Sequence, residues 1–187
     1  MHGYRGAKIS FIEEFLELYA AGKRDFSGLS FSYIYGDYSL LEGADISGIN
    51  LAGANLAQCG FIGTNLSNAF LVGIDVSEGF LDDCNLSRAD LRGANLIKAR
   101  LYRSDLRSAD LSYAKLTRAN LAGAIGPAII NHTNLAEADL RNTVGFMHKN
   151  GLELRQVRYG NIGTFFWNTI MPDGSIETGP VYIADWL

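Results

Sequence analysis

Large apolar residues recur at every fifth position between Phe26 and Leu121, and this period constrains the fold more than any other feature. Steps of five from Phe26 reach twenty positions, of which nineteen hold a large apolar residue and only Gly36 does not. A fixed short period of this kind is typical of a solenoid. An α-helix would spread such residues around its circumference, and a long strand would send them alternately to its two faces. The chain must therefore change direction once in every repeat.

A second series of small residues lies two positions before the apolar ones. Ala89 and Ala94, for example, precede Leu91 and Leu96. Two inward residues separated by one outward residue make a three-residue strand, because side chains alternate along a strand. The two remaining positions of each repeat, such as Arg92-Gly93, are rich in Ser, Gly and charge and are expected to form a corner.

Several segments resemble the A(D/N)LXX motif of the pentapeptide-repeat proteins, namely Ala44–Gly48, Ala54–Leu56, Ala89–Leu96 and Ala119–Leu121. This resemblance implies an all-β fold, a right-handed quadrilateral parallel β-helix with four repeats in each coil. Twenty repeats would give five coils, a stack of about 24 Å at the usual strand spacing. Residues twenty apart would then stack, which places Asp25 over Asp45 and Asp90 over Asp110.

The ends of the chain are predicted to differ from the repeats. Ser10 and Glu13 form a capping-box pattern ahead of an apolar stretch that ends at Gly22, which predicts a short N-terminal capping α-helix. The pattern resumes at Leu135 one residue out of phase, so a slip is expected around residues 126–132. We therefore divide the chain into an N-terminal segment (1–23), a β-helix (24–145), and a C-terminal capping region and tail (146–187).

Two short stretches narrow the resemblance. Tyr19–Phe26, ahead of the repeats, is similar to the entry segment of cyanobacterial members of the family, and Thr169–Ile176 resembles their closing segment. Relatives of this kind include a regulator of cell differentiation that works by contacting other proteins. The resemblance therefore implies a regulatory role through protein contacts.

The sequence predicts no catalytic residues, no cofactor and no metal site. Cys59 and Cys84 both occupy the inward small position, where a thiol packs as a small apolar group. The three histidines, which a zinc site would need close together, are scattered along the chain. Stacked carboxylates could serve acid–base chemistry, but here they lie on a convex solvated wall and not in a pocket. The chain is therefore predicted not to be an enzyme.

Charge is distributed unevenly along the stack. Residues 25–85 hold eight acids and no Lys or Arg, whereas residues 88–118 hold eight bases and three acids. This pattern is either an axial dipole that steers a partner or a chance drift of surface residues. The bases lie on several faces, with Arg100 and Arg103 on one of them, and binding to nucleic acid needs a continuous stripe. The sequence therefore argues against a nucleic-acid partner.

One wall of the predicted stack carries apolar side chains at outward positions. These residues are Leu40, Ile62, Phe80 and Tyr102. Solvated positions seldom gather such side chains without a partner surface. We interpret them as a candidate interaction surface, and cover by a terminal cap is the alternative.

The leading functional hypothesis is a non-enzymatic solenoid that acts as a protein–protein interaction scaffold or regulator. The partner would be another protein of unknown identity or a second copy of the chain in a homodimer. The alternative is a DNA-mimicking modulator of a type II topoisomerase, as in some members of the family. No apolar run has the roughly 18 residues of a membrane span, and the N-terminus lacks a signal-peptide pattern. We therefore expect no membrane contact and a cytoplasmic location.

Overall fold

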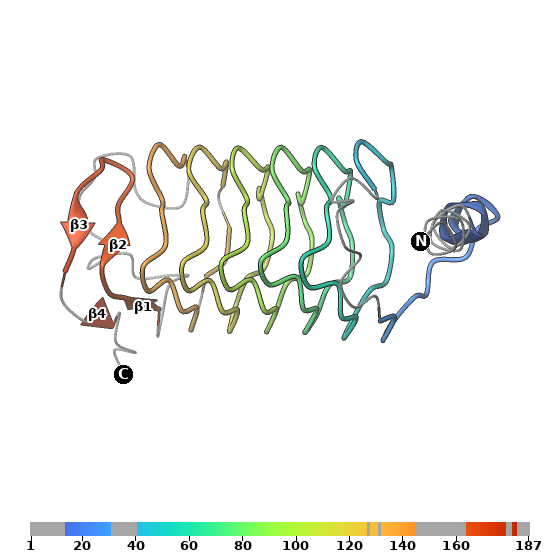
Figure 1. Cartoon of the computed structure of the whole chain (residues 1–187), viewed down its shortest axis with the longest axis horizontal. Helices are drawn as coiled ribbons and strands as arrows, with labels where there is room; N and C mark the ends of the chain where they lie inside the picture. The colour runs from blue at the N-terminus through green and yellow to red at the C-terminus, as the bar shows by residue number, and fades with distance from the viewer. Residues whose placement is uncertain are drawn as a thin grey trace, which may run out of the picture.

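The computed structural model describes residues 14–30, 41–126, 128–130, 132–144, 164–178 and 181–182. Most of these residues form a stack of similar coils, with a helix at one end and two short strand pairs at the other (Figure 1). Parallel bridges join Asp45 to Asn65 and Asn50 to Phe70. The next two repeats pair in the same way, Asn55 with Asp75 and Gly60 with Phe80. Each coil of twenty residues therefore has four sides, as the resemblance implied.

Backbone hydrogen bonds between coils hold the stack together. On one side, the Phe70 N–H donates to the Ile49 carbonyl at 2.8 Å, and the Phe70 carbonyl accepts from the Leu51 N–H at 2.9 Å. The same pairing recurs on each side of the following coils, as for Asp90 with Ala69 and Leu71. The sides of one coil face different directions and cannot pair with one another, so the outward residues in the middle of the stack pair with the coils before and after them.

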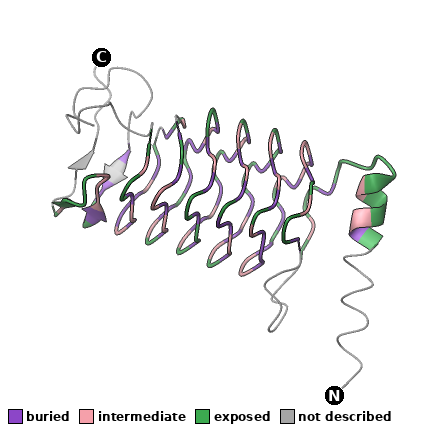
Figure 2. Ribbon diagram, turned by 90° about the horizontal axis from the view of Figure 1, so that it is seen from above, coloured by how far each residue is buried: buried purple, intermediate pink, exposed green. Residues whose placement is uncertain are grey.

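Large side chains fill the axis of the coils. Leu86, Leu91, Leu96 and Leu101 are each 0% exposed, and the outward residues alternate with them along the chain (Figure 2). Polar groups in the interior bond to carbonyls: the Thr64 hydroxyl donates to the Leu41 carbonyl at 2.5 Å. The predicted inward and outward positions are thus confirmed in the described coils.

Each corner is a four-residue turn that needs one left-handed residue. The Ala54 N–H donates to the Leu51 carbonyl at 3.0 Å, and Gly53 between them has a φ of 66°. Glycine adopts this conformation without steric cost, which explains its frequency at the corner. Other coils place a larger residue there, such as Arg88 with a φ of 60°.

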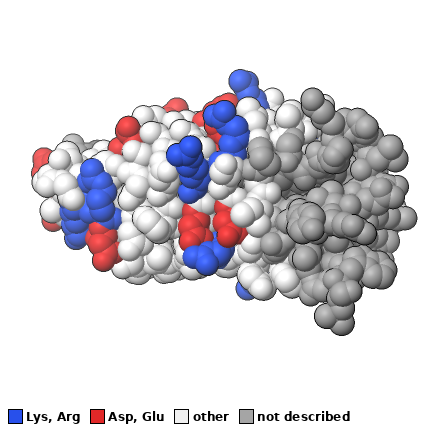
Figure 3. All heavy atoms as spheres, turned by 180° about the vertical axis from the view of Figure 1, so that it is seen from behind, with Lys and Arg blue, Asp and Glu red and all other residues white. Residues whose placement is uncertain are grey.

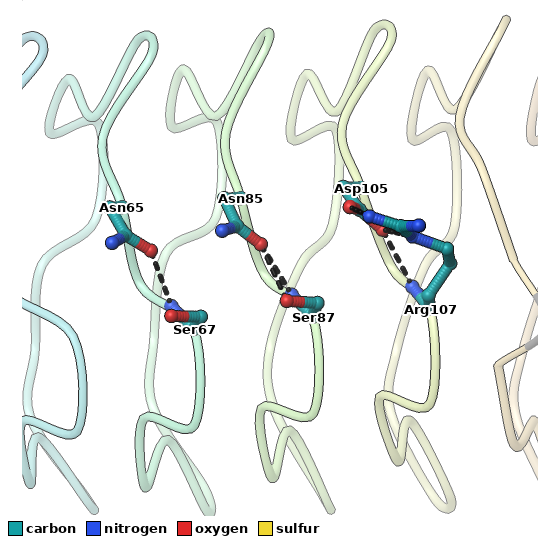
Figure 4. A network of polar contacts seen from close by, with 6 residues as sticks. All are labelled: Asn65, Ser67, Asn85, Ser87, Asp105 and Arg107. Atoms are coloured by element: carbon teal, nitrogen blue, oxygen red, sulfur yellow. Dashed lines mark hydrogen bonds and ion pairs between the residues drawn. The ribbon is translucent and has the colours of Figure 1, made fainter.

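Where an Asp or Asn precedes the large apolar residue, its side chain closes the corner from outside. The Asn65 side-chain oxygen accepts from the Ser67 N–H at 3.1 Å, and Asn85 accepts from Ser87 in the same way (Figure 4). Asp105 accepts from the Arg107 N–H at 3.0 Å. Asp and Asn make this local turn more strongly than Ser and Thr, which accounts for their place in the motif.

The first coil is longer than predicted. Asp25 pairs with Asn50 and Ser30 pairs with Asn55, a spacing of 25 residues, whereas later coils have a spacing of 20. Asp25 therefore does not stack on Asp45, and the expectation of uniform coils from Phe26 is wrong. The first coil thus has five more residues than later coils, and residues 31–40 lie outside the described part of the chain.

The predicted slip near residue 126 is confirmed. Asp105 pairs with Ile125 twenty residues later, but Asp110 pairs with Ile129 only nineteen residues later. The shorter spacing continues to the pairing of Ile125 with Val144. One residue is thus lost between Ile125 and Ile129, and the ladder then continues in the new phase.

Different elements cover the two ends of the ladder. Residues 14–20 form a helix whose Phe15 ring lies 4.6 Å from the Phe26 ring, and the Tyr19 hydroxyl donates to the Ser47 carbonyl at 2.6 Å. At the other end, β1 (Phe165–Phe166) pairs with β4 (Val181–Tyr182), and β2 (Thr169–Ile170) pairs with β3 (Ile176–Glu177). Ile170 also bridges to Asp139 of the last coil, and Phe166 is fully buried.

Candidate interaction surface

Three of the four predicted surface residues lie on one wall, and Leu40 is outside the described residues. Phe80 occupies the middle of that wall, directly between Gly60 and Arg100 in the ladder. Ile62 and Tyr102 follow the inward residues Phe61 and Leu101 and lie at the corner. Tyr102 is 43% exposed, whereas Ile62 and Phe80 are half-buried. Tyr102 is therefore the aromatic group that the wall presents most openly.

Asp82 lies between Ile62 and Tyr102 in the same corner column. It is only 4% exposed, and its Oδ1 accepts a hydrogen bond from the Tyr102 N–H at 3.1 Å. Its Oδ2 lies 2.8 Å from Arg100 Nη2 in an ion pair, although the angles do not make a hydrogen bond. The wall thus combines apolar side chains with a buried carboxylate, which the sequence did not reveal.

Two arginines flank Tyr102. The Arg100 guanidinium lies over the Phe80 ring, 5.3 Å from its centre, and the Arg103 guanidinium lies 6.0 Å from the Tyr102 ring centre. Arg103 also pairs with Asp83 at 3.3 Å. We call Arg100, Tyr102 and Arg103 the Arg–Tyr–Arg cluster. Sequence reasoning placed both arginines on this face but did not connect them with the aromatic residues.

Ion pairs between coils offset the uneven charge of the sequence. The Lys98 ammonium donates to Glu78 at 2.8 Å, in addition to the two Arg pairs described above. This hydrogen bond, with a second from Gln58, holds the pKa of Glu78 below its ordinary value. On the face seen in Figure 3, basic and acidic side chains likewise lie side by side. The acidic and basic halves therefore neutralise each other where they meet.

Comparison with known proteins agrees with this geometry. The family model for pentapeptide repeats (8 copies) matches residues 39–77 and 84–123. The pentapeptide-repeat protein alr5209 from Nostoc PCC 7120 is 33% identical over 60% of this chain and 78% of its own, with a TM-score of 0.23. The chain belongs to the pentapeptide-repeat family.

Two further solved structures match much of the chain. HetL, a pentapeptide-repeat protein involved in heterocyst differentiation regulation in the cyanobacterium Nostoc sp. strain PCC 7120, has a TM-score of 0.56 and 23% identity over 88% of this chain and 98% of its own. QnrB1, a plasmid-mediated fluoroquinolone resistance protein, has a TM-score of 0.40 and 14% identity over 79% of this chain and 69% of its own. A search of curated proteins gives no match.

The stacked acids of this pentapeptide-repeat protein are held by arginine. Asp90 and Asp110 stack as predicted, and Arg92 lies between them, 2.6 Å from Asp90 and 4.0 Å from Asp110. The hydrogen bond from Arg92 keeps the pKa of Asp90 below its usual value. A carboxylate held ionised in this way is a poor general acid at neutral pH.

Other candidate groups lie apart from one another. Cys59 and Cys84 are buried free thiols, and burial raises their pKa values to about 11 and about 12. His132 stacks on Tyr113 with ring centres 4.7 Å apart, and His2 and His148 lie outside the described residues. Within the described ranges, no three His, Cys, Asp or Glu side chains gather as a metal site would require. In the same ranges, no helix has both the length and the apolar character to cross a membrane.

Proposed function

We propose that this pentapeptide-repeat protein is a non-enzymatic scaffold or regulator whose side wall binds another protein. The observation that carries the proposal is the exposed Tyr102 between two arginines that are themselves fixed by ion pairs. Tyrosine and arginine are the residue types most often responsible for binding energy at protein interfaces. A rigid surface also binds with less loss of conformational entropy than a mobile one.

The filled axis supports the same proposal. An enzyme needs a concave site that excludes water, whereas fully buried leucines such as Leu91 and Leu101 occupy the centre of the described coils. The surface of the coils is therefore the part of the molecule available for function. A regulatory role like that of HetL, a cytoplasmic location and a right-handed coil are parts of this proposal.

A pull-down from cyanobacterial lysate tests the proposal. Wild-type protein and Tyr102→Ala are compared with Tyr113→Ala, which removes a tyrosine that is 63% exposed at a different corner. We expect a saturable protein partner that is retained by Tyr113→Ala and lost by Tyr102→Ala, with unchanged thermal stability in both. Absence of a saturable partner, or equal capture by both variants, would contradict the proposal.

Self-association is a second possibility for the same wall. Two copies could pair through a two-fold axis, which would bring the same patch of each copy together. Sedimentation of the wild type at high concentration distinguishes the two cases. A dimer that Phe80→Asp converts to a folded monomer would favour self-pairing, and a wild-type monomer would leave only a different protein as the partner.

DNA mimicry is not the function we propose. A mimic needs a surface with repeated unpaired carboxylates. Here Asp105 and Asp139 are each bound by an arginine two residues later, with ion-pair distances of 2.5 Å and 2.6 Å. Gyrase supercoiling assays test this alternative, and inhibition or activation at micromolar protein would revive it.

A further inference from the structure

We propose that the Arg–Tyr–Arg cluster binds carboxylates on an acidic segment of the partner protein, with Asp82 as the residue that positions Arg100. This inference rests on the proposed function and names the chemistry of its partner. The partner segment would place acidic side chains on the two guanidinium groups and an apolar or aromatic group against Tyr102.

Asp82 occupies a position at which the coil does not need a charge. The neighbouring coils carry Ile62 and Tyr102 in the same column, and the coils beyond them carry Glu42 and Ala122. Burial of the Asp82 carboxylate removes its hydration, a cost that an apolar residue of similar size would not carry. The Oδ1 of Asp82 replaces the local acceptor that other corners take from Asp or Asn, but a neutral Asn would serve as well. The charge of Asp82 is therefore best explained by its effect on Arg100.

Arg100 is held in one orientation by groups on two sides. The buried Asp82 Oδ2 lies 2.8 Å from one terminal nitrogen, and the Phe80 ring lies under the guanidinium plane. The side chain of Arg100 nevertheless remains 54% exposed. A guanidinium has five N–H donors, so the outward edge can still donate two parallel hydrogen bonds to a carboxylate.

Arg103 lies on the other side of Tyr102, where an exposed ion pair and packing of its stem restrain it less strongly than Arg100. It pairs with Asp83, and its stem passes over Gly123, where an added Cβ would lie only 3.2 Å from Arg103 Cγ. Its side chain is 63% exposed. Glycine at position 123 therefore leaves room for the arginine to lie along the wall.

The exposed layer of this wall holds more basic than acidic side chains although its total charge is balanced. Arg100 and Arg103 are exposed and so is Asp83, whereas the Asp82 side chain is only 6% exposed. A carboxylate of a partner can therefore approach Arg100 more closely than it approaches Asp82. Nucleic acid fits less well, because phosphate binding depends on a continuous row of bases, and the bases of the coils are spread over several faces.

Binding of short labelled oligomers at low ionic strength tests the inference. The probes are octaglutamate, octalysine and an eight-nucleotide single strand of DNA. We compare Arg100→Gln/Arg103→Gln with Arg92→Gln/Arg107→Gln, which changes the net charge equally at other corners. Loss of the two charge-assisted contacts should weaken octaglutamate binding at least about tenfold in the first variant and less than about twofold in the second. Equal weakening would mean non-specific charge attraction and would overturn the inference.

Asp82→Asn tests the positioning role separately. This variant keeps the side-chain shape and the acceptor for Tyr102, but it raises the net charge by one. Simple electrostatics predicts tighter binding of octaglutamate, whereas loss of the fixed Arg100 orientation predicts weaker binding by about threefold or more. Asp105→Asn, which changes the charge equally elsewhere, should leave the affinity unchanged. Tighter binding by Asp82→Asn would remove Asp82 from the proposal.

The outcomes separate this inference from the proposed function. If capture of the lysate partner requires Tyr102 but not Arg100 and Arg103, the interface stands and its acidic partner chemistry is wrong. If capture does not require Tyr102, the proposed function of this wall is wrong, irrespective of the affinity for octaglutamate. Binding of the oligonucleotide in preference to octaglutamate would also overturn the inference, because it would indicate a nucleic-acid surface.

Discussion

Left-handed residues at the corners carry a local conformational cost wherever they are not glycine. Ser108 and Gly93 occupy the same corner position, with φ values of 61° and 67°. A side chain in this region of φ brings its Cβ close to the following carbonyl, at a cost of about 1–2 kcal/mol for an ordinary residue. The corners of the coil therefore differ in stability although their backbone is nearly the same.

The single substitutions Ser108→Gly and Gly93→Ser should change the free energy of unfolding in opposite directions. Ser108→Gly relieves the strain, and we expect a gain of about 0.5–1 kcal/mol after allowance for the greater freedom of glycine in the unfolded chain. Gly93→Ser should cost a similar amount, although its Cβ would meet nothing within 4 Å. Denaturant unfolding of both variants measures the effect. Equal loss of stability in the two variants would show that the left-handed conformation at the corner does not determine the effect of these substitutions.

The sequence predicted the features that follow the period of five and those that shift its phase. The positions of Leu91 and Ala94 revealed which residues face inward, and the phase of Leu135 revealed the loss of one residue. The five additional residues of the first coil were not predicted, because an insertion of this length leaves the phase of the apolar pattern unchanged. Only the apolar position held by Gly36 hinted at it.

The site was less predictable than the fold. Spacing placed Ile62, Phe80 and Tyr102 on one wall, but it could not show how open each side chain is. The ion pair between Asp82 and Arg100 joins a corner to the middle of a neighbouring side. Such a contact depends on side-chain length and direction, which a repeat pattern does not contain.

At the scale of the coil, paired aspartates make stability depend on pH. Asp90, Asp105 and Asp139 each accept hydrogen bonds from the arginine two residues later, and these bonds lower their pKa values. A carboxylate with a lowered pKa in the folded state stabilises that state above its unfolded pKa of about 3.9. This stabilisation is lost as the pH falls through the folded pKa.

Replacing the three aspartates by asparagine should flatten this dependence. Asn65 and Asn85 show that asparagine makes the same local turn. We expect the triple variant to lose less stability than the wild type between pH 5 and pH 3, as followed by thermal unfolding. At pH 7 it should be slightly less stable, because each exposed ion pair contributes at most about 1 kcal/mol. An equal loss of stability in both proteins as the pH falls would mean that other carboxylates cause the pH dependence.

The N-terminal helix should stabilise only the coils next to it. Phe15 is 4% exposed against Phe26, whereas Leu18 on the same helix is 39% exposed. In a solenoid each unit contacts only its neighbours, so loss of a cap frays one end first. Phe15→Ala should speed hydrogen exchange in residues 41–60 and leave residues 91–120 unchanged, with Leu18→Ala as the control. Uniform exchange along the stack would mean that the whole protein opens as one unit.

For the molecule as a whole, the two thiols report opening of the stack. The thiolate is the reactive form, and burial raises the pKa values of Cys59 and Cys84 to about 11 and about 12. At pH 8 we expect no reaction of the folded protein with a disulfide-based thiol reagent, and reaction of both thiols in denaturant. Rapid modification of either cysteine in the folded protein would show that the coils around it open readily.

The constant length of the coils also has a kinetic consequence. Between Asp45 and Val144 each coil closes a loop of twenty residues, or nineteen after the slip, so the entropy lost on closure is nearly the same at each of these steps. Once one pair of coils has formed, each further coil adds to an existing edge at similar cost. Folding should therefore spread outward from a nucleus among the uniform coils, and the longer closures at the two ends, from Asp25 to Asn50 and from Asp139 to Ile170, should form last.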